Sequence, residues 1–91
     1  MKPSEYVRKG WCQVVSSRDT DGRPCNPDDP NAAQWCLVGA VKAAYPEDTK
    51  HRYNVCTKLQ TALGKLQFAR WNDNLNRTQA EVIALLESIG E

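Results

Sequence analysis

The sequence has no apolar run long enough to cross a membrane. The longest one, "WCLVGAV", covers Trp35 to Val41, whereas a transmembrane helix needs about 20 apolar residues. The N-terminal segment "MKPSEYVRKG" also lacks the apolar stretch of a signal peptide. We therefore expect a cytoplasmic protein without a membrane partner, whose four cysteines are reduced thiols rather than disulfides.

An excess of one charge sign is also missing. Twelve Lys and Arg residues balance eleven Asp and Glu residues, which gives a net charge of +1. Such a balance produces no overall attraction to nucleic acids or to anionic membranes. Basic residues do gather on the helix that we expect to begin near residue 48, where they would form a basic face of Lys50, Arg52, Lys58 and Lys65. This basic face leaves a small nucleic-acid-associated factor as an alternative function.

Residues of the common catalytic and metal sites are sparse. His51 is the only histidine, and we expect it on the surface in the first turn of a helix. Consecutive cysteines are 13, 11 and 20 residues apart, at Cys12, Cys25, Cys36 and Cys56. Structural zinc sites usually contain closely spaced ligand pairs, and the scattered glycines form no phosphate-binding loop. These absences predict a non-enzymatic protein with no catalytic residue, no metal and no cofactor.

The length and the turn signals predict one compact domain, residues 1–91, with a mostly helical α+β fold. A short N-terminal helix is expected over Ser4–Lys9, with Pro3 in its first turn. A small β-hairpin should follow, with Asp-Gly turn chemistry at Asp19–Gly22. Its second strand, around Pro24–Pro27, can only be an edge strand because proline does not donate to a sheet.

A central buried helix is predicted next. Asp28 or Asp29 can cap its start and Pro30 fits its first turn, while the following proline stops it near Ala44. Lys42 is the only charge in its second half, so we expect this helix to be buried nearly all round. Its small residues would let a neighbour pack closely, at Cys36, Gly39, Ala40 and Ala43.

Two amphipathic helices complete the predicted fold. The first begins at Asp48 or Thr49, and Gly64 should kink or split it. Its apolar stripe consists of Val55, Cys56, Leu59, Ala62, Leu63 and Leu66. The second begins with a capping box, Thr78–Glu81, and ends at Gly90.

The segment "RWNDNLNRTQAEV" (residues 70–82) is the most distinctive in the chain. Trp71, Asn72 and Asp73 could hold a ligand through one aromatic ring, one amide and one carboxylate. We favour a structural interpretation, in which Trp71 closes the core and the two polar residues bind free backbone amides in the turn. Arg77 would then pair with Asp73 or with an aspartate before the central helix.

Five short motifs follow one another along nearly the whole chain: Trp11-x-Gln13, Asp19-x-x-Gly22, Trp35-Cys36-Leu37-x-Gly39-Ala40, Trp71-Asn72-Asp73 and Arg77-Thr78-x-x-Glu81-Val82. This layout resembles a family of small bacterial and phage-borne proteins catalogued only as a domain of unknown function. The resemblance implies a cytosolic, compact, single-domain protein. It implies no activity, cofactor or catalytic residue.

The sequence favours a small cytosolic binding or regulatory protein that acts through contact with a partner protein. The candidate binding residues are Gln13, Trp71, Asn72, Asp73 and Arg77. The phage-borne relatives suggest one special case, an inhibitor of a host system. The nucleic-acid-associated factor described above is the alternative.

Overall fold

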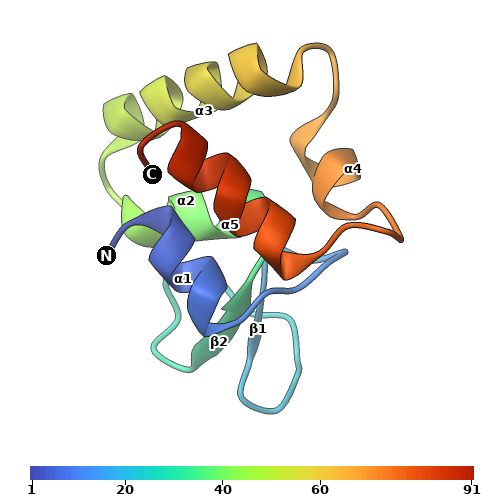
Figure 1. Cartoon of the computed structure of the whole chain (residues 1–91). Helices are drawn as coiled ribbons and strands as arrows, with labels where there is room; N and C mark the ends of the chain where they lie inside the picture. Colours follow the sequence, from blue (N-terminus) through green and yellow to red (C-terminus); the bar gives the residue numbers. More distant parts are fainter.

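The computed structural model describes residues 1–91 as five helices and one two-stranded antiparallel sheet (Figure 1). In chain order the elements are α1 (Pro3–Lys9), β1 (Ser17–Asp19), β2 (Ala32–Trp35), α2 (Leu37–Ala44), α3 (Thr49–Leu63), α4 (Phe68–Asn72) and α5 (Gln79–Ser88). The predicted mostly helical α+β fold is therefore confirmed. None of the five helices combines the length and the apolar character that a bilayer crossing requires.

The two ends of the chain meet where α1 and α5 lie side by side (Figure 1). The Ser4 amide donates to the Glu91 carbonyl oxygen at 3.0 Å, and the Gln79 side chain donates to the Val7 carbonyl oxygen at 2.7 Å. The predicted position of α1, ending before Gly10, is confirmed. Because a helix of about two turns is unstable alone, α1 depends on these contacts with the C-terminal segment.

The sheet pairs β1 with β2, and Ser17 lies opposite Trp35. The predicted turn at Asp19–Gly22 is present, with the Gly22 amide donating to the Asp19 carbonyl oxygen at 3.0 Å. The predicted second strand at Pro24–Pro27 is wrong, since this segment supplies only an isolated bridge to Arg18. Prolines cannot donate to a ladder of hydrogen bonds, and the later segment β2 pairs with β1 instead.

The predicted central helix is wrong in its first half. It was expected to begin at residues 28–30, but α2 begins at Leu37 because the preceding residues form β2. Trp35 is held from outside the sheet as well, since its amide donates to the Gly10 carbonyl oxygen at 3.0 Å. Tertiary pairing thus overrides the local helix propensity of this segment. The predicted end of the helix at Ala44 is confirmed.

A single hydrophobic cluster fills the space between the helices, and α2 lies at its centre, as its apolar composition predicts. The buried members are Val7, Trp35, Leu37, Ala40, Val41, Ala43, Val55, Leu59, Val82 and Leu86. They come from α1, β2, α2, α3 and α5. Every element except β1 and α4 therefore contributes a buried apolar side chain to the core.

Gly39 allows the close approach that its position predicted, and the neighbour is a loop. The Ser16 carbonyl oxygen lies so close to the Cβ position of residue 39 that an alanine there would collide with it. The same oxygen accepts a hydrogen bond from the Cys36 amide at 3.0 Å. The segment before β1 is thus fixed against the first turn of α2.

The bounds of α3 agree with the cap signals in the sequence. The Asp48 side chain accepts from the His51 amide at 3.0 Å and caps the start of the helix. Gly64 ends the helix with a φ of +66°, a conformation that glycine adopts without a steric penalty. The predicted interruption at Gly64 is confirmed.

The predicted apolar stripe of this helix is buried only in part. Val55 and Leu59 are buried, whereas Ala62 and Leu66 are exposed. Leu66 lies beyond Gly64, where the chain leaves the helix direction. The chain then forms α4, a five-residue helix that the sequence did not predict.

The capping box of α5 is confirmed. The Thr78 hydroxyl accepts from the Glu81 amide at 3.2 Å, and the Glu81 carboxylate accepts from the Thr78 amide at 3.0 Å. The hydrogen bond from the Thr78 backbone is the main cause that lowers the pKa of Glu81. Gly90 follows the helix with a φ of +81°, as the sequence predicted.

We expect the substitution Gly39→Ala to lower the free energy of unfolding by about 1–3 kcal/mol, the usual effect of overpacking. The added methyl group must displace the Ser16 carbonyl oxygen and weaken its hydrogen bond with the Cys36 amide. Urea denaturation measures the effect. Ala84→Leu, at an exposed position of α5, adds more volume but should change the stability by less than about 0.5 kcal/mol. A Gly39→Ala variant as stable as the parent would contradict this packing.

Candidate functional site

Asn72 is a buried polar side chain at the end of α4, with only 1% of its surface exposed. Its Oδ1 atom accepts from the Trp11 indole nitrogen at 2.9 Å and from the Leu37 amide at 3.0 Å. Its Nδ2 atom donates to the Cys12 carbonyl oxygen at 3.1 Å and to Asp73 Oδ1 at 3.0 Å. The side-chain amide therefore uses both of its donors and both acceptor positions of its oxygen.

The end of α4 also holds the segment that follows Cys12. Gln13 Nε2 donates to the carbonyl oxygens of Asn72 and Asn74, both at 2.9 Å. The Val14 amide donates to Asp73 Oδ1 at 2.9 Å. We call these three hydrogen bonds the Gln13–Asp73 clasp. They hold Val14 at a φ of +78°, which is a rare and unfavourable backbone conformation for a β-branched residue.

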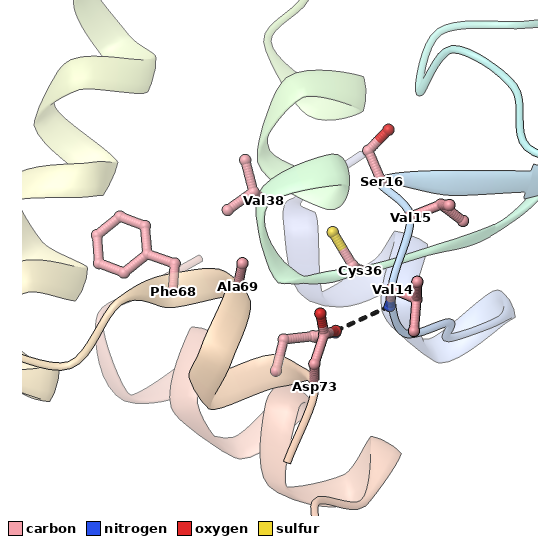
Figure 2. A pocket seen from close by; sticks show the side chains of 9 residues that line it. Val14, Val15, Ser16, Cys36, Val38, Phe68, Ala69 and Asp73 are labelled. Atoms are coloured by element: carbon pink, nitrogen blue, oxygen red, sulfur yellow. Dashed lines mark hydrogen bonds between the residues drawn. The ribbon is translucent and has the colours of Figure 1, made fainter. Parts of the chain in front are cut away.

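A pocket of about 210 Å³ lies beside the clasp (Figure 2). We call it the Val14 pocket, and its lining consists of Val14, Val15, Ser16, Cys36, Val38, Phe68, Ala69, Asn72 and Asp73. Figure 2 shows that the segment before β1, the start of α2 and both ends of α4 contribute to it. Val14 stands at the rim, because 80% of its surface is exposed.

Asp73 is the only charged side chain in the lining of the Val14 pocket. Both of its hydrogen bonds use Oδ1, with the Val14 amide and the Asn72 side chain as donors. Its Oδ2 atom has no hydrogen bond, and no Lys or Arg lies within ion-pair distance of the carboxylate. The pocket thus combines apolar walls with one negatively charged oxygen that is free to accept a hydrogen bond.

The thiol of Cys36 lines the pocket and accepts from the Gly39 amide at 3.3 Å, which caps the start of α2. Burial raises the pKa of the Cys36 thiol. Burial likewise raises the pKa of Cys12, to about 11. Since the thiolate is the reactive form of cysteine, burial lowers the reactivity of both side chains.

Two of the five candidate binding residues, Trp71 and Arg77, belong neither to the lining of this pocket nor to the clasp. The Arg77 guanidinium group lies 3.9 Å from the centre of the half-buried Trp71 ring and donates to the Trp71 carbonyl oxygen at 2.9 Å. It also pairs with Glu81 at 3.1 Å. The predicted pairing of Arg77 with Asp73 or with an aspartate before α2 is therefore wrong. The other three candidates, Gln13, Asn72 and Asp73, come together in the clasp.

The four cations of the predicted basic face do not share one surface. Consecutive residues of an α-helix are rotated by about 100°, which places Lys50 and Lys58 about 80° apart but Lys50 and Arg52 about 160° apart. Arg52 is half-buried and lines a polar hollow together with Lys42. Lys65 lies beyond the end of α3. The charges are therefore spread around the helix and do not form a continuous phosphate-binding face.

His51 lies in the first turn of α3, as predicted, and 40% of its side-chain surface is exposed. Its ring packs on Tyr45 with a centroid distance of 4.1 Å, and its Nε2 atom lies 3.7 Å from Glu91 Oε2. The Tyr45 hydroxyl donates to Glu91 Oε1 at 2.7 Å. This cluster lies at the opposite end of α2 from the Val14 pocket, so His51 and Asp73 share no site. No three His, Cys, Asp or Glu side chains come together as potential metal ligands.

The sequence did not reveal the apolar side of the pocket, which is formed by Val14, Val15, Val38 and Phe68. A positive φ is normally indicated by glycine or asparagine, and a valine gives no such signal. Phe68 is the only phenylalanine in the chain and follows the interruption at Gly64. That position is the one signal that could have directed attention to α4.

Comparison with known proteins identifies one family. The sequence model of a family described as a family of unknown function (DUF6197) matches residues 5–90. No curated protein and no solved structure matches the chain. The matched range includes the clasp and every residue that lines the Val14 pocket.

We expect Asn72→Leu to lower the free energy of unfolding by about 3–5 kcal/mol. The leucine has a similar size but leaves the Trp11 indole, the Leu37 amide and the Cys12 carbonyl oxygen without partners, at about 1–3 kcal/mol for each buried group. Chemical denaturation measures the loss. Asn76→Leu is the matched control, because Asn76 is exposed and its side chain makes no hydrogen bond. Similar losses in both variants would show that Asn72 has no special role.

Alkaline pH should weaken the fold through Tyr45. Burial, assisted by the hydrogen bond to Glu91, raises the pKa of Tyr45 to about 12 from its ordinary value of 10.0. A pKa raised in the folded state means that this stabilisation is complete below pH 10 and is lost as the pH rises toward 12. We expect the parent to lose more thermal stability than Tyr45→Phe between pH 9 and pH 12. Parallel losses in the two proteins would contradict the raised pKa.

Proposed function

The chain belongs to the DUF6197 family, a family of unknown function, and we propose that it is a non-enzymatic binding protein that contacts a partner protein through the Val14 pocket. The proposal places it in the cytoplasm. A phage-type inhibitor of a host system is one form of it, because such an inhibitor also acts by binding. Three observations support the proposal: the strained and exposed Val14, the small apolar pocket beside it, and the raised pKa values of the Cys12 and Cys36 thiols.

The conformation of Val14 is the observation that carries the proposal. Backbone strain of this kind has an energy of about 1–3 kcal/mol and persists only where the surrounding structure enforces it. Here the clasp enforces it with hydrogen bonds from Gln13 and to Asp73. The Val14 side chain adds nothing to the core, because it is 80% exposed. A strained apolar residue held outward at the rim of a pocket is typical of a binding surface.

The size of the pocket favours a protein partner over a small molecule. Sites for small molecules usually have volumes of about 300–1,000 Å³, whereas this pocket has about 210 Å³. One apolar side chain of a partner can fill such a volume while the exposed Val14 packs against the adjoining chain. Leu75 and Tyr53, two other exposed apolar residues, are 97% and 72% exposed but do not line the pocket. The Val14 pocket therefore offers both a cavity and an apolar rim.

The chemistry of the pocket supports a binding role over catalysis. Its only thiol, Cys36, is kept protonated by burial, and no histidine lines it. Nucleophilic catalysis requires a nucleophile next to a base that activates it. Asp73 could serve as a base, but its neighbours in the lining include no activated nucleophile. The basic residues around α3 give no specific support to the nucleic-acid alternative.

We expect Val14→Gly to keep or raise the melting temperature and to weaken binding. Glycine adopts a positive φ freely, so the substitution removes strain, and it also removes the apolar rim. The probe is a random peptide library displayed on yeast and selected on the immobilised parent protein. Selected peptides should bind Val14→Gly at least about tenfold more weakly, as expected from the loss of one buried aliphatic side chain.

Leu75→Gly is the matched control for this experiment, since it removes another exposed apolar side chain that lies outside the pocket. It should leave the peptide affinities unchanged. Failure of the library to yield any binding peptide would refute the proposed function. So would peptides that bind the parent and Val14→Gly equally well.

A further inference from the structure

We infer that the Val14 pocket recognises an extended polypeptide segment in which an aliphatic residue is followed or preceded by Lys or Arg. The aliphatic side chain fills the pocket and the cation pairs with Asp73. The partner chemistry inferred here rests on the proposed function, and three observations define it: the pocket walls, the free oxygen of Asp73 and two unpaired backbone amides.

The walls of the pocket select an aliphatic side chain. Val15, Val38 and Phe68 provide apolar surface, and the protonated Cys36 thiol behaves as a small apolar group. A polar side chain placed there would lose its hydrogen bonds with water and gain few in return. Burial of a leucine, isoleucine or methionine side chain is favourable instead.

The charge of Asp73 selects a basic neighbour. Its Oδ1 atom is occupied by the Val14 amide and the Asn72 side chain, and its Oδ2 atom is free. The sequence predicted Arg77 as its partner, but Arg77 is engaged with Trp71 and Glu81. The half-buried carboxylate therefore has no cation within the chain. A Lys or Arg from a partner would supply the missing countercharge, at the edge of the apolar cavity.

The backbone beside the pocket can bind an extended chain. The amides of Val15 and Ser16 donate no hydrogen bond within the protein, although both residues are half-buried pocket residues. The following strand, β1, is already paired with β2 and bridged to Pro24. The free donors thus lie just before β1, where a carbonyl oxygen of the bound segment can accept from one of them. Such main-chain pairing gives affinity, and the pocket and Asp73 give the selectivity.

The peptides selected from the random library on the parent protein test this inference. We expect enrichment of an aliphatic residue next to Lys or Arg. Replacing that basic residue by Gln in a synthetic peptide should weaken binding to the parent by about tenfold. The same replacement should have little effect on binding to Asp73→Asn, which removes the charge but retains an oxygen that can accept from the Val14 amide.

A measurement on the parent protein keeps the inference testable if Asp73→Asn fails to fold. Affinity for the peptide with Lys or Arg should fall as sodium chloride is raised, because salt screens a partly exposed ion pair. Affinity for the Gln peptide should stay nearly constant. Selected peptides that depend on Val14 but contain no basic residue, or bind independently of salt, would overturn this inference and leave the proposed function intact. Peptides that do not depend on Val14 would overturn both.

Discussion

The side-chain amide of Asn72 is the interaction on which the rest of the structure depends. Its four hydrogen bonds join the loop after α1, the first turn of α2 and the end of α4. These segments share too little regular structure to hold one another, since the only sheet has two short strands. A buried amide whose donors and acceptors are all satisfied fixes one specific arrangement of these segments, because any other arrangement would leave polar groups unpaired.

The positions of the clasp and the pocket depend on these hydrogen bonds of Asn72. Because Asn72 is fixed, the carboxylate of the next residue, Asp73, is placed to accept a hydrogen bond from the Val14 amide. The Asn72 carbonyl oxygen is likewise placed to accept one from the Gln13 side chain. The segment before β1 is also fixed at Ser16, whose carbonyl oxygen accepts a hydrogen bond from the Cys36 amide and packs against Gly39. The chain between these anchors has little freedom, and this restriction holds Val14 in an unfavourable conformation at the rim of the pocket. The stable structure around it thus maintains the strained backbone conformation of the exposed Val14.

Local signals predicted the parts of the fold that local chemistry determines. The caps at Asp48 and Thr78 and the interruption at Gly64 lie where the sequence indicates them. The helix predicted to begin at residues 28–30 was wrong because Trp35 is held in a strand by partners far away in the sequence. No pattern within that segment carries this information.

The candidate site likewise has one part that the sequence predicted and another part that depends on tertiary packing. Asn72 and Asp73 were predicted from their chemical character, and the structure brings them together with the third candidate, Gln13. The side chain of Asn72 binds groups of distant segments rather than the amides of its own turn that the sequence had suggested. The apolar wall could not be predicted, because it depends on how α4 packs beside α2 and on a positive φ at a valine. Such features arise from tertiary constraints that override local preference.

Amide hydrogen exchange measured by NMR tests whether the clasp holds the exposed Val14 in place. The Val14 amide is bonded to Asp73, whereas the Val15 amide has no hydrogen bond within the protein. Two neighbouring valines therefore provide an internal comparison. We expect the Val14 amide to exchange at least about a hundredfold more slowly than the Val15 amide, despite the exposed side chain of Val14. Equal, rapid exchange of the two amides would contradict this expectation.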